Sequence, residues 1–242
     1  MRFAWCFGFC VLGAVALGQQ KSFVACPIVR DTKTVPCYLA EYDGETYFLG
    51  IQQDVTSEFH PPQLKHQVLV EGRIAEGPRV CGGIPLEPVS ISVLKEISLS
   101  CNTLLPPEPG MDAPPAPAAP RATEPARREG LTGRQEFTML YAFDDDYADY
   151  AASQAVTGAA AYAKRIGAKN VKVSGSRATS LLSSGERLVE KPGIAEKRAQ
   201  GVATLLRGLG ISGVSTDAKT EAEPGDGKTD PSRRRVTIVV IP

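Results

Sequence analysis

The sequence is poor in the residue types that most often carry catalysis. It has two histidines, His60 and His66, which flank a Pro-Pro pair in a loop and lack the spacing of a helical metal pair. Beyond residue 134 it has neither histidine nor cysteine, and Val173-Ser174-Gly175-Ser176 does not match a Gly-x-Ser-x-Gly nucleophile elbow. Paired carboxylates remain the one catalytic option. We therefore expect a non-catalytic protein with no metal and no cofactor.

An excess of charge of one sign is also missing. The chain has 27 Lys and Arg against 27 Asp and Glu. Residues 21–105 are slightly acidic, with ten Asp or Glu against seven Lys or Arg. Proteins that hold nucleic acid need a positively charged groove or patch. Nucleic acid is therefore not an expected partner.

Long hydrophobic runs are absent except at the N-terminus. There Arg2 precedes the uncharged, apolar stretch Phe3–Leu17, and Ala16-Leu17-Gly18 offers small residues to a signal peptidase. The run is too short to span a bilayer comfortably. We expect residues 1–18 to be a signal peptide and predict Sec-type export to the periplasm or to an outer-membrane-associated location. An uncleaved anchor, or a lipid on Cys26, is the less favoured alternative.

The cysteines outside this segment agree with export. Four remain, and an even number in an oxidising compartment predicts two disulfides among Cys26, Cys37, Cys81 and Cys101. Three pairings are possible, and the sequence does not choose among them. A zinc site is disfavoured because no C-x-x-C pair occurs and the spacings are long.

Residues 21–105 read as a small all-β domain. Strand-forming residues fill Pro36–Tyr42 and Glu45–Leu49, and Asp43-Gly44 between them predicts a type I′ hairpin turn. Gln67–Ile74 and Val80–Glu96 predict two or three further strands, with a bulge or bend at Gly82-Gly83. Four or five short strands suggest an OB-like barrel.

A Pro-rich linker is expected at residues 106–134. Eight prolines fall between Pro106 and Pro125, and most of the remaining residues are small or charged. Such a segment buries too little apolar surface to offset its ordering entropy, and it favours an extended conformation. We expect a spacer between two domains.

Residues 135–242 alternate between strand and helix patterns. The expected elements are a strand at Glu136–Phe143, a helix at Asp144–Arg165, a strand at Val171–Gly175, a helix at Ile194–Leu209 and a strand at Val236–Ile241. Asp144, Asp145 and Asp146 would favour the positive end of the first helix dipole. The order β-α-β-α-β makes the whole chain an α+β protein with helices layered on a sheet.

Four segments in this part carry a family resemblance. They are Tyr141-Ala142-Phe143-Asp144, Val171-Lys172-Val173-Ser174-Gly175, Glu196-Lys197-Arg198-Ala199-Gln200-Gly201-Val202 and Arg233-Arg234-Arg235-Val236-Thr237-Ile238. In this order and spacing they are similar to the opening strand, the strand before the Gly-His-Thr-Asp turn, the Arg-Ala helix and the closing strand of OmpA-like domains. The resemblance covers residues 137–240.

The resemblance implies that this domain binds peptidoglycan through the peptide stem. Family members hold the carboxylate of diaminopimelate with the helix arginine, which falls on Arg198, and its ammonium with the Asp of the turn. Here the turn begins at Gly175 and Ala178 stands where that Asp would be. The longer following segment contains Glu186 and Glu190, either of which would replace the missing acid.

The resemblance also nominates Arg234 or Arg235 as a site residue, and at least one of Arg233, Arg234 and Arg235 should be solvated. The alternative to ligand binding for Arg198 is a structural ion pair with Glu186, Glu190 or Glu196. Two functions follow: a cell-envelope protein that binds peptidoglycan, or an OmpA-like domain that has lost wall binding and contacts other envelope proteins.

Overall fold

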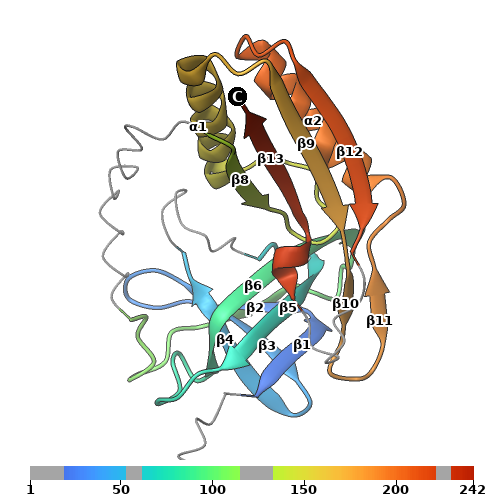
Figure 1. The fold of residues 1–242 in the computed structure, drawn as a ribbon. Helices are drawn as coiled ribbons and strands as arrows, with labels where there is room; N and C mark the ends of the chain where they lie inside the picture. Colours follow the sequence, from blue (N-terminus) through green and yellow to red (C-terminus); the bar gives the residue numbers. More distant parts are fainter. Residues whose placement is uncertain (1–18, 53–61, 115–132, 222–229) are drawn as a thin grey trace, which may run out of the picture.

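The computed structural model describes residues 19–52, 62–114, 133–221 and 230–242 (Figure 1). The predicted signal peptide, His60 and most of the Pro-rich linker lie outside the described residues. An all-β unit at residues 20–105 lies below a unit of strands and helices at residues 135–241 in Figure 1. The α+β class expected from the sequence is confirmed.

The first unit contains one seven-stranded sheet in the order β1-β5-β6-β4-β3-β2-β7. Its strands are β1 (Gln20–Ala25), β2 (Pro27–Arg30), β3 (Cys37–Tyr42), β4 (Glu45–Ile51), β5 (His66–Ile74), β6 (Ile84–Ile97) and β7 (Thr103–Leu105). The sequence pattern missed β1, β2 and β7. The expected number of four or five strands is therefore too low. An OB-like barrel stays a prediction.

The β3–β4 hairpin forms at the predicted turn. Asp43 and Gly44 have φ angles of 53° and 73°, as a type I′ turn requires at both central residues. The strands pair antiparallel from Tyr42 and Glu45 outwards. This turn is thus fixed by local sequence.

Two disulfides link the first unit, as expected from the even number of cysteines. The pairs are Cys26–Cys101 and Cys37–Cys81, which are separated by 75 and 44 residues of sequence. Each bridge closes a long loop of a small domain, which reduces the entropy of its unfolded state.

The first unit continues past residue 105. The Arg30 guanidinium lies 2.6 Å from the Glu108 carboxylate, and Asp112 lies 3.5 Å from the Lys33 ammonium. Ala113 packs against the apolar cluster around Cys37 and Cys81. Glu108, Asp112 and Ala113 therefore contact the first unit, although residues 106–110 are exposed. The linker boundary expected at Pro106 stays a prediction.

The second unit has a four-stranded sheet in the order β12-β9-β13-β8. The elements are β8 (Gln135–Leu140), α1 (Tyr150–Ile166), β9 (Asn170–Arg177), β10 (Thr179–Leu181), β11 (Arg187–Val189), α2 (Ile194–Gly208), β12 (Val214–Thr220), a 3-10 turn (Pro231–Arg233) and β13 (Arg235–Ile241). The β-α-β-α-β order is present, with the β10–β11 hairpin and β12 added. Strand β12 pairs parallel to β9.

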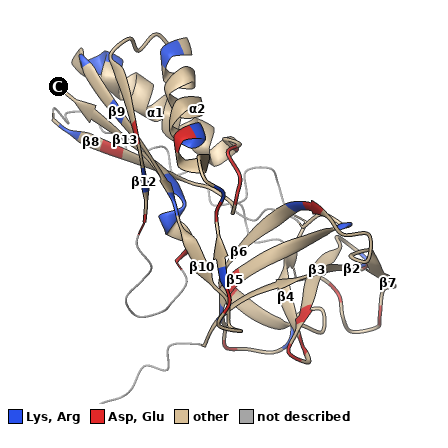
Figure 2. Cartoon of the chain, turned by 90° about the vertical axis from the view of Figure 1, so that its right-hand side faces the viewer, with Lys and Arg blue, Asp and Glu red and all other residues tan. Residues whose placement is uncertain are grey.

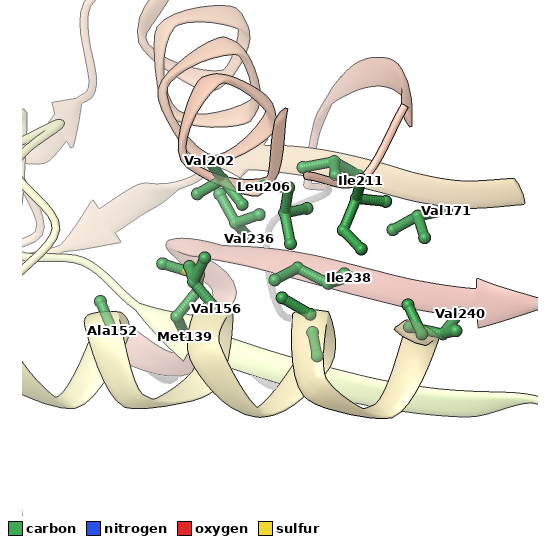
Figure 3. Close-up of a cluster of buried hydrophobic side chains, with 14 of the residues drawn as sticks. Met139, Ala152, Val156, Val171, Val202, Leu206, Ile211, Val236, Ile238 and Val240 are labelled. Atoms are coloured by element: carbon green, nitrogen blue, oxygen red, sulfur yellow. The ribbon is translucent and has the colours of Figure 1, made fainter. Parts of the chain in front are cut away.

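Both helices cover one face of this sheet. Val236, Ile238 and Val240 alternate along β13 and are fully buried, in one cluster with Val156 of α1 and Leu206 of α2 (Figure 3). Side chains two residues apart on a strand share a face. The helices therefore pack side by side on that face, and this core fixes where α2 lies relative to β9.

Helix α1 begins later than expected. Asp149 is its N-cap and accepts a hydrogen bond from the Ala152 amide, whereas Asp144 has a φ of 53° and lies outside the helix. The predicted helix start at Asp144 and the dipole role of residues 144–146 are wrong. The amide of Asp144 instead bonds to the distant Glu190 side chain, which no local pattern reveals.

Candidate carboxylate site

Helix α2 positions Arg198 over the end of β9. Gly175 of β9 allows the close approach, because a Cβ there would collide with the Ala195 carbonyl of α2. Arg198, one turn further along α2, is fully buried. A long cationic side chain is almost never buried unless its charge is paired. The position of α2 therefore demands an anion beside Arg198.

Glu190 supplies that anion. Arg198 Nη2 donates to Glu190 Oε1 at 2.6 Å, and Nη1 donates to Oε2 at 3.2 Å. Both side chains have a relative exposure of 0%. This two-point contact between the planar guanidinium and carboxylate is the strongest form of ion pair. The sequence analysis gave an ion pair as the alternative to ligand contact for Arg198, and Glu190 is the partner in this structure.

The remaining N–H groups of Arg198 are bonded to backbone carbonyls. Acceptors are Asp145 at 2.7 Å, Ser176 at 2.9 Å and Ala142 at 3.0 Å. With the two bonds to Glu190, all five guanidinium N–H groups have partners. The guanidinium also lies 4.9 Å from the ring centre of Tyr141, within cation–π range.

The Glu190 carboxylate is held by two backbone amides as well. The Asp144 N–H donates to Oε1 at 3.0 Å, and the Ala178 N–H donates to Oε2 at 2.9 Å. One guanidinium and two amides converge on a single carboxylate. We call Arg198 together with the Asp144 and Ala178 amides the carboxylate receptor.

A second buried arginine joins the two units. Arg234 Nη2 donates to Glu71 Oε2 at 2.5 Å, and Nη1 donates to Glu71 Oε1 at 3.2 Å. The Ser180 hydroxyl donates to Glu71 Oε1 at 2.8 Å and accepts from Arg234 Nη1 at 2.9 Å. Glu71 belongs to β5 of the first unit. Arg234 therefore contacts the first unit in this structure.

The other residues nominated from the sequence fall into two groups. The charged ones lie apart from the receptor, and the uncharged ones lie beside it. Glu186 is exposed at the far end of the β10–β11 hairpin, and Arg235 pairs with Glu221 at 3.1 Å. Gly175 serves the packing of α2. Ala178 is buried and contributes its amide.

Two contributing residues were missed at the sequence level. Glu71 and Ser180 both bond to Arg234. Glu71 lies 163 positions from Arg234 and 109 positions from Ser180. Glu71 did leave a signal, because it is a lone acid in the otherwise apolar run Val68-Leu69-Val70. A charged residue inside such a strand is usually paired when buried. Ser180 left none.

Burial also affects neighbouring titratable groups. It raises the pKa of Tyr141 well above the usual range, so that its phenol stays neutral beneath Arg198. For Glu221, burial favours the neutral acid, but the hydrogen bond and charge of Lys219 and the charge of Arg235 outweigh it and lower the pKa.

A groove lies next to the receptor at the junction of the two units. Its volume is about 480 Å³, and its walls include Tyr141, Ala142 and Asp145, each of which contacts Arg198. Ile91, Val93 and Lys95 of β6, in the first unit, also line it. Basic and acidic residues are mixed over the described parts of both units (Figure 2).

Within the described residues, no helix is long and apolar enough to cross a membrane. The same parts of the chain hold no group of three or more His, Cys, Asp or Glu placed to bind a metal ion.

The fold was compared with known proteins. No family model and no curated protein matches the chain. Among solved structures, it is similar to the OmpA-like domain of FopA1 from Francisella tularensis subsp. tularensis SCHU S4, with 21% identity over 44% of this chain and 71% of that chain and a TM-score of 0.37. The cell wall anchor of the T6SS from Pseudomonas aeruginosa gives 20% identity over 47% and 85% with a TM-score of 0.34.

A third similar structure is a putative MotB like protein from Desulfovibrio vulgaris. It shows 18% identity over 45% of this chain and 73% of that chain, with a TM-score of 0.36. At these identities the likeness concerns the fold and carries no ligand or partner to this chain. The first of these structures is itself an OmpA-like domain, the family that the sequence resembles, and the divergence of the turn at Ala178 stays a prediction.

Proposed function

We propose that this chain is a non-catalytic protein of the bacterial cell envelope that binds the peptide stem of peptidoglycan through the carboxylate receptor. One observation carries the proposal: Arg198 and the amides of Asp144 and Ala178 together hold a carboxylate with four hydrogen bonds of 2.6–3.2 Å. A stem carboxylate offers the same two oxygens to the same donors. The resemblance assigns this role to the arginine of α2.

Binding requires that Glu190 leave the receptor. In the described conformation its carboxylate occupies the position that a ligand carboxylate would take, and the exchange of one carboxylate for another conserves the hydrogen bonds. Released Glu190, with Asp144, then supplies negative charge for the ammonium of the stem in place of the family's missing Asp. The groove beside Tyr141 and Asp145 provides space for the rest of the peptide.

The periplasmic or outer-membrane-associated location is part of the same proposal. It is supported by the two disulfides of the first unit, because such bonds persist in oxidising compartments. Cell fractionation followed by non-reducing mass spectrometry tests it. A chain found in the cytosol with four free thiols would contradict the location.

Cosedimentation with purified peptidoglycan tests the ligand. Glu190→Ala should sediment more strongly than the unsubstituted chain, because the receptor is then empty. Glu190→Ala combined with Arg198→Ala should lose this gain, since a charge-assisted bond is worth about 1.5–3 kcal/mol, or roughly a tenfold to hundredfold change in affinity. Sedimentation by neither the unsubstituted chain nor Glu190→Ala would overturn wall binding.

A second candidate is an interaction module that has lost wall binding. It is favoured by one observation: Arg198 is fully buried and every N–H it carries is already bonded within the chain. In that case Glu190 is a permanent structural partner. Glu190→Ala would then lower stability without adding any affinity for peptidoglycan.

A further inference from the structure

The β10–β11 hairpin is held by the first unit. The Ser22 amide donates to Ser183 Oγ at 3.0 Å, and the Ser183 amide donates to the Ser22 carbonyl at 2.6 Å. Ser180 bonds to Glu71 as described above. Both views of the fold place β10 beside β5 of the first unit (Figures 1 and 2). Edge strand β1 and strand β5 therefore fix the position of the hairpin.

Apolar packing adds to these bonds. Leu182, in the hairpin turn, is buried in one cluster with Leu69 of β5 and Phe143 of the second unit. The Phe143 amide also donates to Ser92 Oγ of β6 at 2.8 Å, and both residues are buried. Hairpin, first unit and the segment after β8 thus share one interface.

The base of the same hairpin carries the carboxylate receptor and its occupant. Ala178, whose amide is part of the receptor, directly precedes β10, and Glu190 directly follows β11. Lys191, the next residue, forms an ion pair at 3.2 Å with Glu96 of the first unit. The first unit therefore contacts the hairpin at its turn, along β10 and at the residue after Glu190.

From this continuity we infer that docking of the first unit controls the receptor: the docked unit keeps Glu190 in place, and separation of the units frees the hairpin and opens the receptor to an external carboxylate. The ligand named here rests on the proposed function, whereas the coupling does not. Linkage is reciprocal, so a carboxylate that displaces Glu190 weakens docking by the same factor.

Hydrogen exchange of the Ala178 and Asp144 amides in the full chain tests the coupling directly. Glu190 oxygens are the acceptors of both amides, so their exchange reports whether Glu190 is in place. Glu71→Ala removes the partner of Arg234 and should speed both exchanges by about 5–150-fold, the usual range of coupling between sites. Glu71→Leu with Arg234→Met is the matched control, because it leaves no buried charge unpaired and should keep both amides protected.

A locking variant keeps the test decisive if Glu71→Ala does not fold. Ser22→Cys with Ser183→Cys places a removable crosslink where the two serines are already hydrogen-bonded. The oxidised form should exchange both amides more slowly than the same chain after mild reduction, with the unsubstituted chain as control for the reductant. Equal protection of both amides with and without the lock would overturn the inference.

Peptidoglycan sedimentation separates this inference from the proposed function. If Glu190→Ala binds peptidoglycan while Glu71→Ala neither binds nor exposes the two amides, the coupling is wrong and wall binding stands. If Glu71→Ala exposes the amides but no variant sediments, the coupling stands and the proposed ligand is wrong. If Glu71→Ala does both, the first unit regulates wall binding.

Discussion

Both buried arginines of this chain have their charge neutralised by a buried glutamate, but the two glutamates come from different units. Arg198 and Arg234 are both fully buried, and each meets a buried glutamate through two donor nitrogens. Arg198 takes Glu190 from eight residues away, within its own unit. Arg234 takes Glu71 from 163 residues away, in the other unit. One pair fills a site and the other joins two units.

The surroundings of the two carboxylates differ as well. Glu190 accepts hydrogen bonds from two backbone amides in addition to those from Arg198. Glu71 accepts a hydrogen bond from the Ser180 hydroxyl in addition to those from Arg234. A backbone amide is an obligatory donor, but a hydroxyl can rotate towards another acceptor. The fixed amides around Glu190 therefore favour a carboxylate at that position, whereas the surroundings of Glu71 require only that the hydrogen bonds of the interface are made.

The largest expected effect comes from removal of either glutamate. Glu190→Ala or Glu71→Ala leaves a buried guanidinium without its counter-charge, which costs about 3–5 kcal/mol. Glu190→Ala should destabilise the second unit, and Glu71→Ala should divide one unfolding transition into two. Differential scanning calorimetry measures both. A single transition of unchanged midpoint in either variant would contradict the role of that pair.

Replacement of both members of a pair should have a different effect on stability at each of the two sites. Glu71→Leu with Arg234→Met should be nearly neutral, because buried ion pairs often contribute little beyond a hydrophobic pair of similar volume. Glu190→Leu with Arg198→Met should still destabilise, by about 1–3 kcal/mol for each amide left without an acceptor. Urea unfolding followed by circular dichroism gives both values. Equal costs at the two sites would remove the distinction.

A change at Gly175 should disturb one pair and spare the other. Gly175→Ala forces α2 away from β9, where Arg198 meets the Ser176 carbonyl, and overpacking of this kind costs about 1–3 kcal/mol. Gly201→Ala in the same helix is the control: its Cβ meets no atom within 4 Å, and it should stabilise by about 1 kcal/mol. Thermal unfolding of both variants tests this. A Gly175→Ala chain as stable as Gly201→Ala would contradict the close contact.

The smallest expected effect is a pH dependence of docking. The pKa of Glu96 is lowered from its ordinary 4.5, first by a hydrogen bond with its own backbone and then by the hydrogen bond and charge of Lys191. Because the pKa of Glu96 is lower in the folded than in the unfolded chain, its ionised carboxylate stabilises the folded state. This stabilisation is complete above pH 4.5 and is lost as the pH falls through the folded-state pKa. The melting temperature should therefore drop slightly more below pH 4.5 in the unsubstituted chain than in Glu96→Gln.

Much of the second unit could be predicted from its sequence. Helix α2 begins at Ile194 as expected, and β13 lies within one residue of its predicted bounds. Both have strong apolar periodicity, which is a local signal. Strand β12 was missed because Val214–Thr220 is polar and largely exposed at the edge of the sheet. The late start of α1 was missed because a side chain 46 residues away fixes Asp144.

The candidate site was predictable in its members but not in their arrangement. Arg198 and Glu190 were both nominated, yet the pattern of residues does not say whether they face a ligand or each other. That choice depends on the β10–β11 hairpin, which the sequence suggested only as a longer connection. The pairing of Arg234 with Glu71 depends on how two units dock, and a docked interface leaves little trace in local periodicity.

The Cys26–Cys101 bridge has a mechanical consequence. It connects the chain just after β1 to the chain just before β7 and so spans 75 positions of sequence. A pull applied between residue 19 and residue 114 passes through this covalent bond, and the residues between the two cysteines carry no tension. Under such a load the part of the sheet between Cys26 and Cys101 cannot be pulled into an extended chain. Extension is confined to the short segments on either side of the bridge.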